Sequence, residues 1–199
     1  YYLDVVRAAK RARPDIHVKA FTMVEIDHML KISGKSEDEV FADLREAGLG
    51  SCPGGGAEVL VDRVHKAVFR EKQGPQGWLD TARKVQKAGF KMNATMLYGH
   101  IERTEERVTH LVKLRELQDE CGGFMAYIPL AFWPYHTDLE NFGHVTTGWC
   151  DLRNIAVSRL MLDNFEHIKA YWIMLTPESA QTALAWGAND IDGTVTEEK

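Results

Sequence analysis

The sequence has few cysteines and no long apolar run, and both absences restrict what the protein can be. Its three cysteines, Cys52, Cys121 and Cys150, are far apart and odd in number. They match no metal-ligand spacing and pair with no histidine at zinc-motif distance, so we expect reduced, mostly buried thiols and no metal ligands. No segment approaches the roughly 18 apolar residues of a spanning helix, and no signal-peptide pattern opens the chain, which indicates a cytoplasmic protein.

An excess of positive charge is also missing. The chain has 24 Lys and Arg residues against 29 Asp and Glu, a net charge of -5, and the two signs are interspersed. This pattern argues against a nucleic-acid partner, which would require a basic face, and against binding to an anionic membrane. The remaining composition, 45% hydrophobic and 27% charged over 199 residues, is that of an ordinary globular protein, and we expect residues 1–199 to form a single domain.

Helical and extended patterns alternate from one end of the chain to the other. Strands are expected over residues 16–21, 49–53, 90–98, 124–132, 167–175 and 184–193. Six extended segments separated by helices predict a parallel α/β sheet, and their even repetition favours a (β/α) barrel over an open doubly wound sheet. An amphipathic helix over residues 1–9 has no capping residue ahead of it, so we expect that a preceding segment has been lost.

Local signals place several helix ends. Ser36 and Glu39 form a capping box, and Gly48 provides the left-handed residue that ends the helix following it. Thr104 is the expected N-cap of a helix that continues through residue 117, and Thr176, followed by proline, begins a short one. The segment 133–149 has no clear period and is interpreted as an active-site loop.

In a (β/α) barrel the functional groups lie at the carboxyl ends of the strands. The candidates at or after these ends are Thr22, Glu25, Gly54, Gly55, Gly56, Glu58, Arg63, Asn93, Thr95, Tyr98, His100, Asn189 and Asp192. Because strand residues two apart share a face and the loop continues at that end, we expect Asn93, Tyr98 and His100 to lie together at the barrel mouth. His65, His110 and His167 are expected at the surface.

Three of these segments permit both a functional and a structural interpretation. The three consecutive glycines of PGGGAE allow the backbone to approach a ligand closely and to bind an anion through N–H groups, with Glu58 accepting from a ribose or an ammonium group; alternatively they form a flexible turn. The segment is neither GxGxxG nor a P-loop. His100 can donate to a substrate carboxylate or move a proton, or it can be a hydrogen-bonded structural residue. Asn189 and Asp192 can bind a purine or sugar or simply make a turn.

With these residues the sequence resembles the radical S-adenosylmethionine (SAM) enzymes of menaquinone biosynthesis, and among them the aminofutalosine synthases. The resemblance is carried in family order by HVKAFT, AGLGSCPGGGAE, NATMLYGHIE, LRELQDECGGFMAYIPLAF, VSRLMLDN, IKAYWIML and GANDIDGT. The triple-glycine turn is unlike the PGTAAE-type turn of the deazaflavin (F420) synthases. The segments NATMLYGHIE, IKAYWIML and GANDIDGT are less similar to dehypoxanthine futalosine cyclase.

The resemblance implies a TIM-type (β/α) barrel that uses SAM, a [4Fe-4S] cluster and an electron donor such as flavodoxin or ferredoxin. In that family the 5′-deoxyadenosyl radical adds to the small-molecule substrate 3-[(1-carboxyvinyl)oxy]benzoate, and rearrangement with loss of the carboxyl group yields aminodeoxyfutalosine. The family's CxxxCxxC motif is expected before residue 1, together with the first strands, so the chain alone is expected to be inactive.

On this basis the candidates divide by role. His100, Asn93 and Tyr98 are the expected catalytic residues; Thr22, Glu25, Gly54, Gly55, Gly56 and Glu58 are expected to bind the cofactor, and Arg63, Thr95, Asn189 and Asp192 the substrate. Two alternatives stay open. One is a cyclase-like or deazaflavin synthase-like enzyme with another acceptor, and the other is a non-catalytic partial barrel that binds a ligand or self-associates through its open edges.

Overall fold

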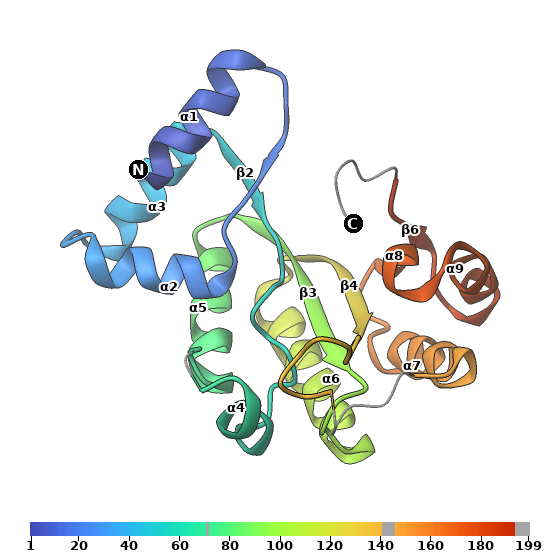
Figure 1. Ribbon diagram of the computed structural model, residues 1–199. Helices are drawn as coiled ribbons and strands as arrows, with labels where there is room; N and C mark the ends of the chain where they lie inside the picture. The colour runs from blue at the N-terminus through green and yellow to red at the C-terminus, as the bar shows by residue number, and fades with distance from the viewer. Residues whose placement is uncertain (71, 141–145, 194–199) are drawn as a thin grey trace.

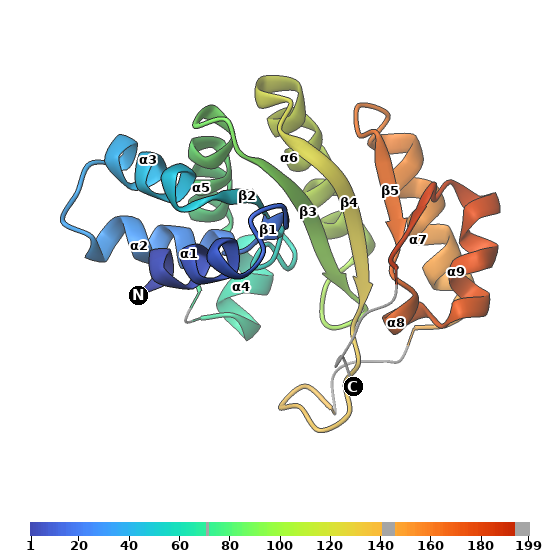
Figure 2. The ribbon, with the colours of Figure 1, turned by 90° about the horizontal axis from the view of Figure 1, so that it is seen from above.

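The computed structural model describes residues 1–70, 72–140 and 146–193, and a curved parallel sheet runs through all three parts. Within them the strands are β1 (Val18–Lys19), β2 (Leu49–Cys52), β3 (Lys91–Tyr98), β4 (Phe124–Ala131), β5 (His167–Ala170) and β6 (Asp190–Ile191). They pair in the order β1-β2-β3-β4-β5-β6, and every neighbouring pair is parallel. The strands curl into a half-barrel with helices along the convex side (Figures 1 and 2). This confirms the six predicted strands and a partial TIM-type barrel.

Helices fill the connections between the strands. In the described residues they are α1 (Tyr2–Ala12), α2 (Met23–Ile32), α3 (Glu37–Ala47), α4 (Asp62–Val68), α5 (Pro75–Lys87), α6 (Thr104–Cys121), α7 (Gly148–Met161), α8 (Trp172–Leu175) and α9 (Pro177–Ala183), followed by a 3-10 turn over Leu184–Trp186. The capping box of Ser36 and Glu39 is present, and Gly48 has a φ of 99°. The Thr176 hydroxyl accepts from the backbone N–H of Ser179, as the predicted N-cap requires.

Two predicted strands and one predicted cap differ from the structure, and one predicted loop lies partly outside the described residues. The strand expected over residues 184–193 begins as a 3-10 turn over Leu184–Trp186 and is extended only over Asp190–Ile191. The strand expected over residues 167–175 ends at Ala170, and Trp172–Leu175 is helical, because an apolar run of this length cannot be assigned to strand or helix by its periodicity alone. Thr104 is the first helical residue rather than the cap, and Glu106 instead accepts from the backbone N–H of Arg103. Part of the predicted active-site loop 133–149 lies outside the described residues.

The two faces of the sheet have different chemistry because strand side chains alternate. In β3, Met92, Ala94, Met96 and Tyr98 are completely buried in the core that the sheet forms with the helices. The intervening residues, beginning with Asn93, therefore point to the concave face. The convex side holds the apolar core, and the concave side is free to contact a ligand.

Two histidines that were expected at the surface are buried, which corrects that prediction. His65, on α4, is 3% exposed, and its Nε2 lies 3.0 Å from the carbonyl oxygen of Ala57. His110, on α6, is 0% exposed, and its Nδ1 accepts from the backbone N–H of Leu60 at 3.1 Å. Burial, assisted by the charge of Lys113, lowers the pKa of His110 to about 3. Each ring satisfies backbone groups that the chain buries around α4.

The depressed pKa of His110 makes folding sensitive to acid. Below its ordinary pKa of 6.5 the unfolded chain binds a proton there and the folded chain does not. Stability that is fully present above that value is therefore lost as the pH falls toward about 3. As the pH falls from roughly 7 to 5, we expect protonation of His110 in the unfolded chain to lower the free energy of unfolding by about 2 kcal/mol.

Urea unfolding of His110→Gln at both pH values tests this, since glutamine keeps an acceptor for Leu60 and does not titrate. The free energy of unfolding of the variant should fall by about 2 kcal/mol less between the two pH values than that of the parent, even if the substitution itself changes stability. His28→Gln, at an exposed histidine on α2, should keep all of it. An unchanged pH dependence in His110→Gln would contradict the assignment.

Candidate functional site

The glycine turn after β2 is packed directly against β3. A Cβ at Gly54 would lie 2.4 Å from the carbonyl oxygen of Asn93, so no larger residue fits there. The Thr95 hydroxyl donates to the Gly54 carbonyl at 2.8 Å, and the Trp78 indole N–H donates to the Gly55 carbonyl at 3.2 Å. Gly56 has a φ of +91°, a conformation that side chains disfavour. The turn is therefore a fixed part of the concave face rather than a flexible connection.

Thr22 and Glu25 lie beside this turn, at the point where β1 leads into α2. The Glu25 carboxylate accepts from the backbone N–H of Thr22 at 2.8 Å and from its hydroxyl at 2.9 Å, which makes a capping box for α2. A Cβ on Gly55 would lie 3.0 Å from the Thr22 methyl group. Phe21, just before the cap, has a φ of 65°, a strained value for an aromatic residue and one often found at functional sites.

Glu58 closes the turn next to the carboxyl end of β3. Its carbonyl accepts from the backbone N–H of Leu97 at 3.0 Å, and its carboxylate lies 2.5 Å from the ammonium group of Lys72. Its side chain is 14% exposed. Thr22, Glu25, Gly54, Gly55, Gly56, Glu58, Asn93 and Thr95 are thus brought together by β1, β2 and β3, as expected for one site at the strand ends.

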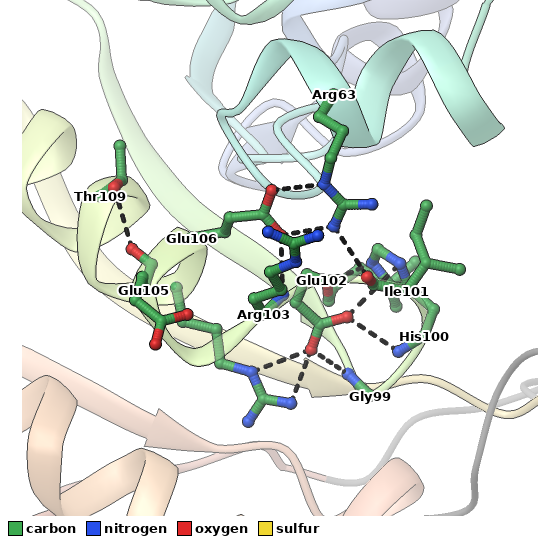
Figure 3. A network of polar contacts seen from close by, with 11 residues as sticks. Arg63, Gly99, His100, Ile101, Glu102, Arg103, Glu105, Glu106 and Thr109 are labelled. Carbon is green, nitrogen blue, oxygen red and sulfur yellow. Dashed lines mark hydrogen bonds and ion pairs between the residues drawn. The ribbon is translucent and has the colours of Figure 1, made fainter.

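The turn between β3 and α6 is organised by the carboxylate of Glu102 (Figure 3). This side chain is 0% exposed and accepts from the backbone N–H groups of Gly99 at 2.6 Å and His100 at 2.9 Å. Arg107 donates to the same carboxylate at 2.8 and 2.6 Å. A buried carboxylate with this many donors is compensated, and it fixes the backbone that follows β3.

His100 takes part in this turn and does not present its ring to a cavity. Its side chain is 0% exposed, and its Nε2 lies 2.9 Å from the carbonyl oxygen of Leu97. Phe69 and Phe132 pack edge-on against the ring, each with its centroid 5.8 Å away. Burial lowers the pKa of His100, which keeps the ring neutral. The expectation that His100 faces the cavity is therefore corrected.

Tyr98 lies on the opposite face of β3 from Asn93, because the two residues are five positions apart, an odd number. Its hydroxyl donates to Asp151 of α7 at 2.7 Å, and the guanidinium of Arg107 lies 5.1 Å from its ring centroid. Burial, followed by the neighbouring Asp151 charge, raises the pKa of Tyr98. The predicted cluster of Asn93, Tyr98 and His100 is thus not formed, and a catalytic role for these residues stays a prediction.

Arg63 is also placed away from the concave face, on α4. It donates to Glu106 at 2.7 and 2.6 Å and to the carbonyl of Ile101 at 2.8 Å, so it braces the β3–α6 turn from outside (Figure 3). This ion pair holds the pKa of Glu106 below its usual range. Its contacts in this structure are structural, and its contact with substrate stays a prediction.

The two residues predicted near β6 have different surroundings. The Asn189 side chain accepts from Arg159 at 2.7 Å and from the backbone N–H of Ile168 at 2.9 Å, and it donates to the carbonyl of Glu166 at 2.9 Å. It is a structural bridge at the amino end of β6. Asp192, at the other end, accepts from the Lys169 ammonium at 2.9 Å.

Sequence reasoning did not single out Lys19 and Lys169 of the concave face, nor Lys72, which pairs with Glu58. Lysine is mostly a solvent-exposed residue, so its presence in a sequence carries little information. The available signal was alternation: Lys19 and Lys169 each stand between apolar strand residues that pack into the core.

The described residues do not fit an iron–sulfur cluster. Within them, no group of three or more His, Cys, Asp or Glu side chains could hold a metal ion. Cys52 is buried in β2, whereas Cys121 ends α6 and Cys150 lies on α7. Burial and the nearby charge of Glu25 raise the pKa of Cys52 to about 12, so its thiol stays protonated. None of the described helices is long and apolar enough to cross a membrane.

Comparison with known proteins finds relatives along the whole chain. A family model described as the CofH/MqnC C-terminal region matches residues 121–199. The chain is 53% identical to the aminodeoxyfutalosine synthase of Thermus thermophilus, with 100% of this chain and 54% of that protein covered. It is 37% identical to the 5-amino-6-(D-ribitylamino)uracil--L-tyrosine 4-hydroxyphenyl transferase of Methanococcoides burtonii, with 99% of this chain and 57% of that protein covered. The chain thus spans about half the length of these curated relatives.

Solved structures share the fold at low sequence identity. Methylornithine synthase superposes with a TM-score of 0.67 and 15% identity over 100% of this chain and 53% of that chain. The [FeFe]-hydrogenase maturase HydG gives a TM-score of 0.66 and 16% identity over 96% of this chain and 41% of that chain. These two likenesses show the barrel fold alone, whereas the sequence relatives extend from the first residue to the last. The chain is therefore similar along its whole length to an aminodeoxyfutalosine synthase, and its residues 121–199 match the CofH/MqnC C-terminal region.

Proposed function

We propose that the protein to which this chain belongs is an aminodeoxyfutalosine synthase of menaquinone biosynthesis. It would join the 5′-deoxyadenosyl group to 3-[(1-carboxyvinyl)oxy]benzoate. The observation that carries the proposal is the 53% identity to a synthase of this name along the entire chain, against 37% to a 4-hydroxyphenyl transferase. The relatives are enzymes, which supports a small-molecule substrate.

SAM and a [4Fe-4S] cluster would supply the 5′-deoxyadenosyl radical, with an electron donor such as flavodoxin or ferredoxin. The described cysteines do not fit the cluster, so its ligands would come from a part of the protein outside this chain. The part of the site present here is the wall that Thr22, the Gly54–Gly56 turn and Thr95 build together. We place the nucleoside of SAM against this wall, because the glycine backbone allows close approach.

The concave face would position the substrate and exclude water. A reactive radical requires an enclosed apolar surface with a few directed polar groups, while the cofactor supplies the bond-breaking chemistry. Asn93 and Thr95 supply polar groups on this face and Leu97 an apolar one. Contacts around the neutral ring of His100 keep the carboxyl end of β3 rigid. The proposed contribution of His100 is therefore to hold the mouth of the barrel in shape.

Product analysis tests the proposal. The cluster-loaded gene product is incubated with SAM, a reductant and 3-[(1-carboxyvinyl)oxy]benzoate, and the products are identified by mass spectrometry. We expect aminodeoxyfutalosine to form. The isolated 199-residue chain is expected to form neither this product nor 5′-deoxyadenosine, because its described cysteines cannot assemble a cluster site.

The same preparation is also incubated with the substrates of the 4-hydroxyphenyl transferase reaction, to distinguish the two functions. If the protein instead joins a tyrosine-derived 4-hydroxyphenyl group to 5-amino-6-(D-ribitylamino)uracil and leaves the benzoate substrate unchanged, it belongs functionally with the relatives at 37% identity, and the proposal is wrong. Absence of both products from a preparation with a full cluster would favour a non-catalytic barrel.

Glu58 offers a test of the cofactor wall that does not depend on turnover. If its carboxylate accepts from the ribose or the ammonium group of SAM, Glu58→Gln should weaken SAM binding by about 1.5–3 kcal/mol, the loss of a charged hydrogen bond. Isothermal titration with SAM measures this. The matched control is Lys72→Met, which removes the ion pair of Glu58 but keeps its carboxylate.

We expect the control to bind SAM as the parent does. Both variants should unfold at a similar urea concentration, because an ion pair this close to solvent contributes roughly 0–1 kcal/mol. Unchanged SAM affinity in Glu58→Gln, combined with a loss of stability in both variants, would show that Glu58 only supports the turn.

A further inference from the structure

Two lysines lie on the concave face of the sheet, one at each side. Lys19 stands in β1 between Val18 and Ala20, which both pack against the core, and so it points to the other face. Lys169 stands in β5 between Ile168 and Ala170, which are both 0% exposed in the core. Alternation thus directs both ammonium groups toward the inside of the half-barrel, where no core contact requires them.

Lys169 is neutralised by residues of β6. Its ammonium lies 2.9 Å from an oxygen of Asp192 and 3.3 Å from one of Asp190, and its side chain is only 16% exposed. The register of β5 and β6 places Lys169 opposite Asp190. Burial opposes the positive charge, but the two aspartates outweigh it and raise the pKa of Lys169. This lysine already has its counter-ions.

Lys19 differs from Lys169 in this respect. Among residues 1–70, 72–140 and 146–193, no carboxylate forms an ion pair with its ammonium group and no acceptor forms a hydrogen bond with it. Burial and then the charge of Lys169 lower the pKa of Lys19, while Asp192 and Asp190 act in the opposite direction. Lys19 therefore lies within electrostatic reach of the β5–β6 cluster, and an anion placed beside it would stabilise its charged form.

The surface between these two sides carries apolar side chains as well as the polar Asn93 and Thr95. Leu97 of β3 pairs in register with Leu130 of β4, and Ile128 lies beside Thr95. All three apolar side chains are partly exposed, on the face opposite the fully buried Met96 and Tyr127. A cation on the same face as apolar side chains matches a ligand that has an apolar body and a carboxylate.

We propose that Lys19 is the residue of the concave face that binds a carboxylate of the substrate. Lys169 engages both aspartates, so Lys19 is left to the ligand. The proposal rests on the proposed function only for the identity of the ligand. Lys19 would thus determine specificity for anionic over neutral substrates.

The test compares two probes of the same shape, isophthalate and its neutral diamide. Their dissociation constants are measured by isothermal titration on the gene product that contains this chain, without SAM or turnover. The parent protein should bind isophthalate at least about tenfold more tightly than the diamide, as expected for one charged hydrogen bond. Lys19→Met should abolish this preference, and Lys19→Arg should retain it because the charge is kept.

Lys35→Met is the matched control, since this lysine is exposed and pairs with Asp43 away from the sheet. It should keep the preference, and unfolding curves should show that all variants are folded. The proposal is overturned if Lys19→Met keeps the preference, or if the parent binds isophthalate no better than the diamide or not at all. Product formation is a separate measurement. The proposed function can therefore be wrong while Lys19 still favours isophthalate over the diamide, and Lys19 can lack this preference while the proposed function is correct.

Discussion

The alternation of side chains along the parallel strands is the constraint on which the rest of the structure depends. Helices cover one face of the sheet, and every second residue of β3, from Met92 to Tyr98, is completely buried against them. The residues between, such as Asn93 and Thr95, are left to the concave face. There they hold the glycine turn in place, and that turn brings Thr22 and Glu25 to the same site. The fold thus places the stabilising core on one face and leaves the other face for the proposed ligands.

Polar groups inside this framework are kept either neutral or compensated. Burial keeps the rings of His100 and His110 uncharged, and the Glu102 carboxylate is surrounded by backbone N–H groups and Arg107. An isolated buried charge would cost several kcal/mol, so these arrangements are needed if the strand ends are to be rigid. A rigid rim is what a barrel requires to position a cofactor and a substrate against each other.

Features set by local sequence were predictable, and features set by tertiary packing were not. The capping box of Ser36 and Glu39 depends on four consecutive residues and was predicted correctly, as were the number and the order of the six strands, although not all of their bounds. The burial of His110 depends on where Leu60 comes to lie, fifty positions away in the chain. No local sequence pattern indicates that His110 and Leu60 are close in space. The face occupied by Tyr98 was a different case, because its odd separation from Asn93 already indicated opposite sides of the strand.

The central claim is that ligands contact the concave face and the carboxyl ends of β2 and β3. Hydrogen–deuterium exchange of the gene product, followed by mass spectrometry with and without SAM, tests this most directly. The account predicts slower exchange on SAM binding in the turn 53–58 and in the neighbouring end of β3, with no change in the outer helices α5 and α6. Protection confined to those outer helices, with the turn and the strand end unchanged, would contradict it.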